Sequence, residues 1–85
     1  MTKKDFMKSV GSNLKKELYE HNISQSELSR MTGLSRSIIS EYISGKKLPS
    51  VKNLINMCSR IGCYPHDIVK SFGYIEKGNE RWNDF

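Results

Sequence analysis

The stretch that decides the fold runs from Gln25 to Ser44 and reads QSELSRMTGLSRSIISEYIS. Gly33 interrupts it, and the sequence on either side predicts two short helices. The small Ser29 lies four residues before the glycine, while the apolar Ile39 and Tyr42 lie six and nine residues after it. This spacing lets one helix cross closely over the other and leaves the second helix projecting. It is the arrangement of a helix-turn-helix, whose second helix enters the DNA major groove.

Capping residues bound both helices of this motif. Ser24 followed three residues later by Glu27 is a capping-box pattern, so we expect a helix over 25–32. After the glycine turn, Ser35 is placed to cap a second helix over 36–44.

Upstream, an apolar stripe predicts a long first helix from about residue 4 to residue 21. Its members recur every four residues: Phe6, Val10, Leu14 and Leu18. Gly11 lies inside the stripe, where glycine costs about 1 kcal/mol relative to alanine. Either it permits close packing, or the helix proper starts near it. Asn22 is suited to end the helix, because asparagine tolerates the left-handed conformation.

Downstream, two more helices are predicted, which makes the chain an all-α bundle of about five helices. Ser50 is expected to cap the fourth helix. One apolar face is expected on that helix, formed by Val51, Leu54, Ile55, Cys58 and Ile61. A short fifth helix follows Pro65 and carries Ile68, Val69 and Phe72.

The length of 85 residues fits one domain, which we place at residues 1–72, followed by an extension over 73–85. The net charge is +5, and residues 1–71 hold 12 Lys and Arg against 6 Asp and Glu. A basic domain suits a polyanionic partner. Trp82 and Phe85 in the extension call for burial. Docking on the chain's own domain, a dimer contact and disorder all remain open for this segment.

No metal site, cofactor site or catalytic site is predicted. Cys58 and Cys63 lack a second Cys pair, and His21 and His66 do not complete a ligand spacing. We expect reduced thiols, at least one of them in the core. No nucleophile elbow or phosphate-binding glycine loop occurs, so an enzyme is not expected. The sequence has no signal peptide and no apolar run of about 20 residues, which favours a cytoplasmic protein without a membrane segment.

The order of motifs resembles the phage-repressor helix-turn-helix family, the Cro-like or XRE group of lambda-repressor-like transcriptional regulators. The resemblance covers residues 10–69. It rests on Ser-Gln-Ser-Glu-Leu over 24–28, Gly-Leu-Ser over 33–35, Ile-Ser over 39–40 and Gly-Lys-Lys-Leu-Pro-Ser over 45–50. The resemblance implies a five-helix domain whose third helix reads base edges.

For the third helix, the resemblance implies base contacts by Arg36, Ser37, Ser40 and Glu41. The residues agree, since the inward Ile39 and Tyr42 leave these four on the opposite face. Arg36 can donate two hydrogen bonds to guanine. Ile38 could meet a thymine methyl group or pack beside the first helix.

Around the third helix, the resemblance implies contacts with DNA phosphates. The candidates are Gln25 at the start of the second helix, Ser35, and the loop residues Lys46 and Lys47. A helix N-terminus already favours an anion. Lys15 is expected on a solvated face.

Two residues depart from the family pattern. Ser29 replaces the usual alanine, so its hydroxyl needs a partner, either in the preceding turn or elsewhere. Ile43 replaces a frequent glutamate, which adds apolar surface to the core or to a partner contact.

These features predict a sequence-specific, double-stranded-DNA-binding regulator of transcription, of phage or mobile-element repressor type. One recognition helix reads few base pairs, so a homodimer on an inverted-repeat operator is expected. The alternative is a protein-interaction module or antitoxin, whose partner would be a toxin or an antirepressor. Exposure of Ile38 and Ile43 would favour it. An RNA-binding role lacks the aromatic platform that single-strand recognition uses.

Overall fold

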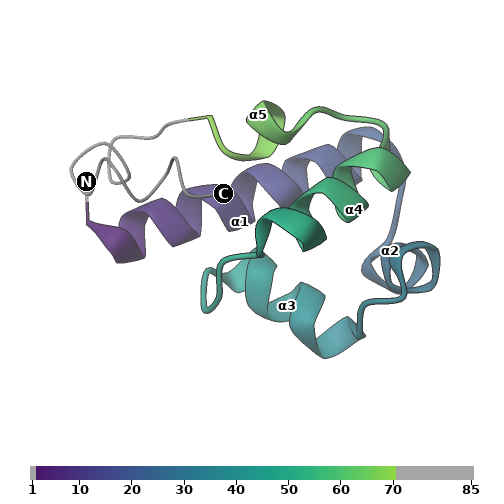
Figure 1. The fold of residues 1–85 in the computed structure, drawn as a ribbon, viewed down its shortest axis with the longest axis horizontal. Helices are drawn as coiled ribbons and strands as arrows, with labels where there is room; N and C mark the ends of the chain where they lie inside the picture. The colour runs from purple at the N-terminus through teal and green to yellow at the C-terminus, as the bar shows by residue number, and fades with distance from the viewer. Residues whose placement is uncertain (1, 71–85) are drawn as a thin grey trace.

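The structure, a computed structural model, describes residues 2–70 as five helices and connecting loops (Figure 1). The helices are α1 (Lys3–Glu20), α2 (Gln25–Thr32), α3 (Arg36–Ser44), α4 (Val51–Ile61) and α5 (Pro65–Ile68). The expected all-α fold is confirmed. Phe72, Trp82, Phe85 and the extension over 73–85, for which the sequence made predictions, lie outside the described residues.

A hydroxyl side chain begins each of the first four helices. Each one accepts a hydrogen bond from the backbone N–H three residues on, as an N-cap does. These residues are Thr2, Ser24, Ser35 and Ser50. Asn22, between α1 and α2, has φ 56°, the left-handed conformation expected of it. The predicted boundaries of α2 and α3 are confirmed.

The core draws on all five helices. α1 contributes every fourth residue, as predicted, and α2 and α3 contribute Leu28, Ile39 and Tyr42. The remaining buried apolar residues are Met57, Cys58, Ile61, Ile68 and Val69. Apolar burial is the main stabilising contribution in a domain of this size.

The predicted apolar face of α4 is wrong at two positions, because Val51 is 38% exposed and Ile55 is exposed as well. Ile55 is 53% exposed, and Met57, absent from the prediction, is fully buried. Two residues along a helix correspond to a rotation of about 200°, so these two side chains cannot both face the core. The buried stripe is therefore centred on Leu54, Met57, Cys58 and Ile61.

Gly11 lies where α1 crosses the end of α3. A Cβ atom there would lie 2.5 Å from the carbonyl oxygen of Tyr42 and would also clash with the carbonyl oxygen of Ile43. The helix runs through this position without interruption. Of the two interpretations of Gly11, close packing is the one observed.

Three asparagine side chains connect helices that are distant in the sequence. The Nδ2 atom of Asn13 donates to the carbonyl oxygen of Ile68 at 2.9 Å, which attaches α5 to α1. On α4, Asn53 donates to the hydroxyl of Tyr42 at 2.9 Å and Asn56 to the carbonyl oxygen of Thr32 at 3.0 Å. These bonds hold α4 against both helices of the motif.

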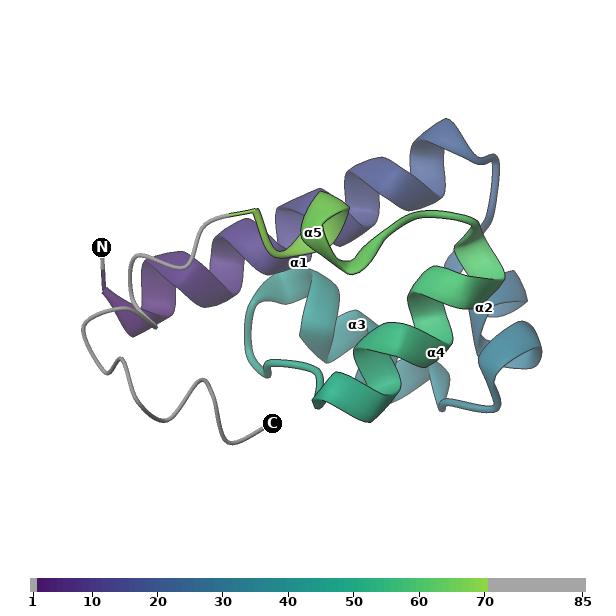
Figure 2. The same ribbon diagram turned by 45° about the horizontal axis from the view of Figure 1, so that its top comes forward.

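α3 and α5 both pack against α1 but on different sides of it, as Figures 1 and 2 show. The surface that carries α3 is therefore distant from the surface that carries α5. Within residues 2–70, no helix combines the length and apolar character needed to span a bilayer.

Candidate nucleic-acid interface

The turn between α2 and α3 is fixed by backbone and side-chain hydrogen bonds. Gly33 has φ 80°, a conformation that glycine adopts without strain, and its N–H donates to the carbonyl oxygen of Ser29 at 2.9 Å. The Thr32 hydroxyl donates to the carbonyl oxygen of Leu28 at 2.7 Å and accepts from the N–H of Leu34 at 3.2 Å. The turn is thus held at both of its ends.

The hydroxyl of Ser29 bridges this turn. It donates to the carbonyl oxygen of Leu34 at 2.6 Å, beyond the glycine, rather than to the preceding turn of α2. An alanine, the residue common at this position in the family it resembles, would leave that carbonyl without this donor. The serine therefore adds a bond between the two sides of the turn.

α3 presents one face to the core and one to solvent. Ile39 and Tyr42 are buried, as predicted, and the hydroxyl of Tyr42 is held by Asn53. Arg36, Ser37 and Ser40 are all exposed on the other face. A rigidly held helix with short polar side chains and one arginine outward has the shape and donors needed to read base edges.

Glu41 differs from the other predicted base contacts because it is half-buried. Within residues 2–70 no ion pair joins it to Arg36. Its backbone carbonyl oxygen accepts from the N–H groups of Lys46 and Lys47, at 2.9 and 3.3 Å. These bonds end α3 at Gly45 and begin the loop that carries Lys46 and Lys47, called the basic loop below.

Ile38 and Ile43 are half-buried and pack against the core. Ile38 thus makes a packing contact, which was one of its two expected roles. Part of its side chain remains exposed on the surface of α3. Ile43 places apolar surface in the core rather than leaving it fully open to a partner.

All four predicted phosphate contacts are exposed at the two ends of α3 and at the start of α2: Gln25, Ser35, Lys46 and Lys47. The oxygen of Ser35 accepts the N–H of Ile38 at 3.1 Å, which leaves its O–H free to donate. Gly45 packs closely against Lys8 of α1, which brings a third lysine to the basic loop.

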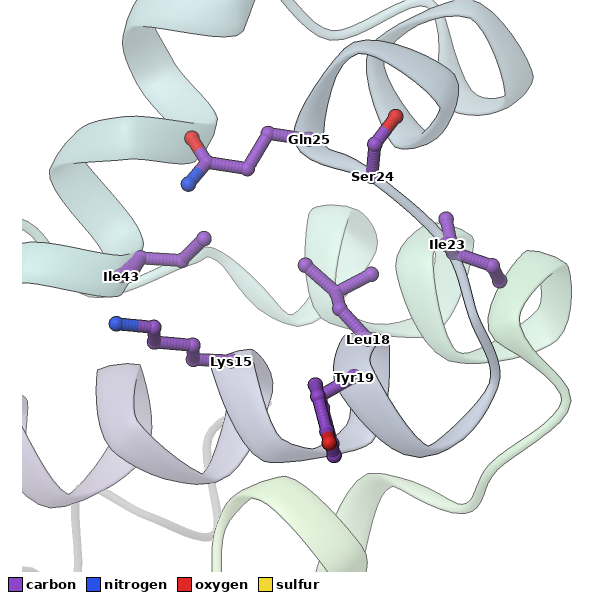
Figure 3. A pocket seen from close by; sticks show the side chains of 7 residues that line it. All are labelled: Lys15, Leu18, Tyr19, Ile23, Ser24, Gln25 and Ile43. Carbon is purple, nitrogen blue, oxygen red and sulfur yellow. The ribbon is translucent and has the colours of Figure 1, made fainter.

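A shallow pocket of about 230 Å³ lies between α1, the start of α2 and the end of α3. Lys15, Gln25 and Ile43 are among its lining residues, and Figure 3 shows the Ile43 side chain between the other two. The sequence did not single out Lys15 as a partner of Gln25. The two residues are ten positions apart on different helices, so only the packing angle brings them together.

The start of α2 also carries a negative charge. The N–H of Ser24 donates to Oε1 of the Glu27 carboxylate at 2.9 Å and is the main cause that holds the pKa of this carboxyl below its usual value, while the Ser24 hydroxyl accepts from the N–H of Glu27 at 3.0 Å. This ionised group offsets part of the positive end of the helix dipole. An anion at this point would therefore need the Gln25 side chain and the Lys15 ammonium group in addition to the helix dipole.

Comparisons with known proteins agree with this geometry. A family model described as helix-turn-helix matches residues 14–68. Among solved structures, the restriction-modification controller protein C.AhdI from Aeromonas hydrophila is similar, with a TM-score of 0.69 and 23% sequence identity over 75% of this chain and 96% of that chain. At this identity the likeness shows a shared fold. No curated protein sequence matches the chain.

Proposed function

This chain belongs to the Cro-like (XRE) helix-turn-helix family of DNA-binding transcriptional regulators, and we propose that it is a sequence-specific repressor of phage or mobile-element type that occupies an operator through α3. The observation that carries the proposal is the outward face of α3. Arg36, Ser37 and Ser40 are exposed there, while Ile39 and Tyr42 anchor the helix in the core.

In this proposal α3 lies in the major groove. Arg36, at its N-terminal end, donates two hydrogen bonds to guanine O6 and N7. Ser37 and Ser40 contact neighbouring base edges, Glu41 accepts from a cytosine amino group, and the exposed part of Ile38 contacts a thymine methyl group.

Phosphate contacts flank the groove on both sides. Gln25 and Ser35 donate to the backbone on one side of α3, and Lys46 and Lys47 bind it on the other. We add Lys15 to this set because it shares a pocket with Gln25. These contacts position the helix and supply the salt-dependent part of the affinity.

A homodimer on an inverted repeat is part of the proposal. Two copies would place their α3 helices in successive major grooves about 34 Å apart. Trp82 and Phe85, the predicted dimer contacts, lie outside the described residues. Occupancy of an operator that overlaps a promoter would exclude polymerase.

Binding of a toxin or an antirepressor protein is the alternative. Exposure of Ile38 and Ile43 would have favoured it, and both are half-buried against the core. The structure thus offers this alternative less apolar surface on α3 than the sequence left open.

The test is selection of binding sites from a random duplex pool, followed by affinity measurements over a salt series. We expect an inverted-repeat motif bound about 10³-fold or more tightly than random DNA. Because the similar C.AhdI is a restriction-modification controller protein, genes of such a system should be searched for the selected motif beside phage genes. Binding that is equal on all duplexes, or absent, would contradict the proposal and favour a protein partner.

A further inference from the structure

Three side chains with metal-binding atoms meet on the side of the domain away from α3. Glu17 comes from α1, Cys63 from the loop after α4, and Asp67 from α5. One carboxylate oxygen of each acid and the Cys63 sulfur all lie within 4.8 Å of one another. This group has no signature in the sequence, because its residues are 46 and 4 positions apart and do not follow the Cys and His spacings of a zinc finger.

The burial of Glu17 is the first reason to expect a cation. This residue is only 9% exposed, and a buried carboxylate is costly unless a cation or hydrogen-bond donors compensate its charge. Within residues 2–70, its one ion pair is with His21, whose Nε2 lies 3.6 Å from Oε1. An imidazole carries a positive charge only when it is protonated.

The surroundings of the Cys63 sulfur are the second reason. Cys63 is half-buried, and its sulfur lies within 4.8 Å of one oxygen of each carboxylate. A thiol sulfur beside two carboxylate oxygens is a donor set that suits a divalent transition-metal ion.

The candidate ligands are also held in place, as ligands of bound metals usually are. The N–H of Tyr64 donates to Oδ2 of Asp67 at 2.8 Å. The other Asp67 oxygen, Oδ1, lies 3.8 Å from Nε2 of the exposed His66. The N–H of Cys63 donates to the carbonyl oxygen of Cys58 at 3.1 Å, which fixes the backbone after α4.

We propose that Glu17, Cys63 and Asp67 bind one divalent transition-metal ion of the Zn²⁺ class, with water in the fourth position. Thiolate with carboxylate oxygen is a ligand set that Zn²⁺ accepts and that Mg²⁺ and Ca²⁺ disfavour. In a tetrahedral site the ligand atoms lie about 3.3–3.8 Å apart. Binding would therefore shorten the distances between the three ligand atoms by about 1 Å. Binding releases the thiol proton of Cys63 to water.

Such an ion would join α1, the end of α4 and α5. Asn13 already connects α1 to α5 by one hydrogen bond, and the metal would add a second and stronger connection. The expected consequence is a higher melting temperature, since a ligand that binds the folded chain stabilises it. This inference does not depend on the proposed operator binding, and its test uses no DNA.

The test is titration of the full-length, reduced, metal-free protein with Co²⁺, followed by displacement with Zn²⁺. We expect one equivalent of Co²⁺ to produce the thiolate-to-cobalt charge-transfer band and the visible absorption of tetrahedral Co²⁺. Zn²⁺ should abolish both and raise the melting temperature. Cys63→Ser should abolish the charge-transfer band, and Glu17→Gln and Asp67→Asn should each weaken binding by about 10-fold or more.

Glu20→Gln, an exposed carboxylate on the same helix, is the matched control and should bind Co²⁺ as the unchanged protein does. Circular dichroism of each metal-free variant verifies the fold. Where a variant does not fold, a measurement on the unchanged protein replaces the comparison of affinities. Bound Zn²⁺ should then protect Cys63 from an alkylating reagent. Absence of the charge-transfer band, absence of protection, or equal affinity in folded Glu17→Gln and Asp67→Asn would overturn the proposal.

Discussion

At the residue scale, Gly11 sets how closely α1 approaches the end of α3. Gly11→Ala would gain about 1 kcal/mol of helix propensity. The added Cβ, however, would meet two backbone carbonyl oxygens, which cannot rotate away as a flexible side chain would. We expect the clash to dominate and to lower the free energy of unfolding by about 2 kcal/mol or more. Thermal denaturation followed by circular dichroism measures this.

The control for Gly11→Ala is Ser12→Ala, an exposed neighbour on the same helix. It should change the stability by no more than about 0.5 kcal/mol. Equal effects of the two substitutions would show that the contact with α3 is not a close one.

Arg36 is the residue on which base preference should depend. Arg36→Ala should relax the sequence selected at one position of each half-site and cost about 1–3 kcal/mol in discrimination there. Site selection with the variant measures the change. An unchanged motif would remove Arg36 from the base-reading set.

The sequence predicted the orientation of α3 because inward and outward residues follow from helical period alone. It did not predict the partner of the Ser29 hydroxyl, because that bond to Leu34 depends on how the chain turns at Gly33. The proximity of Lys15 and Gln25 was missed for a related reason, since it depends on the angle between two helices.

At the scale of the element, α4 offers a test of which face is buried. Met57→Ala should cost about 2–5 kcal/mol, because the side chain is fully buried and its loss leaves a cavity. Ile55→Ala should cost less than about 1 kcal/mol, because more than half of that side chain is exposed. Urea denaturation of both variants measures the difference, and the reverse order would restore the face predicted from sequence.

The capping box of α2 should depend on pH. The Ser24 N–H donates to Oε1 of Glu27 and keeps the pKa of that carboxyl below its ordinary 4.5. A lowered pKa in the folded chain gives stability that is present above 4.5 and is lost as the pH falls through the folded-state value. Glu27→Gln does not titrate.

The melting temperature of the unchanged protein should therefore exceed that of Glu27→Gln at pH 7, and the difference should disappear in acid. Thermal denaturation of both proteins across this pH range measures it. A difference that stays constant from neutral to acid pH would mean that the carboxylate charge does not stabilise the cap.

Helix boundaries were predictable because their signals are local. Ser24, Ser35 and Ser50 begin helices, and Gly33 and Gly45 end them, through bonds within three or four residues. Which face of α4 is buried was less predictable, since Val51, Ile55 and Met57 are all apolar. Only contact with the other helices decides among them.

At the scale of the whole molecule, the excess of positive charge should appear in the salt dependence of DNA binding. Lys47→Ala should weaken binding to all duplexes similarly and reduce the slope of log K against log salt by about 1. Lys70→Ala, an exposed lysine that follows α5 on the side away from α3, should leave the slope unchanged. Equal slopes for both variants would place Lys47 away from the phosphates.

The fold class and most of the candidate interface were predictable from sequence because one contiguous stretch contains the motif. The group formed by Glu17, Cys63 and Asp67 was not, because it exists only once α5 packs on α1.

The length of α3 limits how many base pairs one copy of the chain would read, and so how often its site recurs by chance. Nine residues rise about 13.5 Å, which spans about four base pairs. A four-letter word recurs by chance about once in 256 positions, so a genome of about 10⁶ sites contains it thousands of times. Two copies of the word at a fixed separation recur only about once in 65,000 positions. A regulator built on this helix therefore needs the second word at its fixed separation, which lowers the number of chance matches by a further factor of about 256.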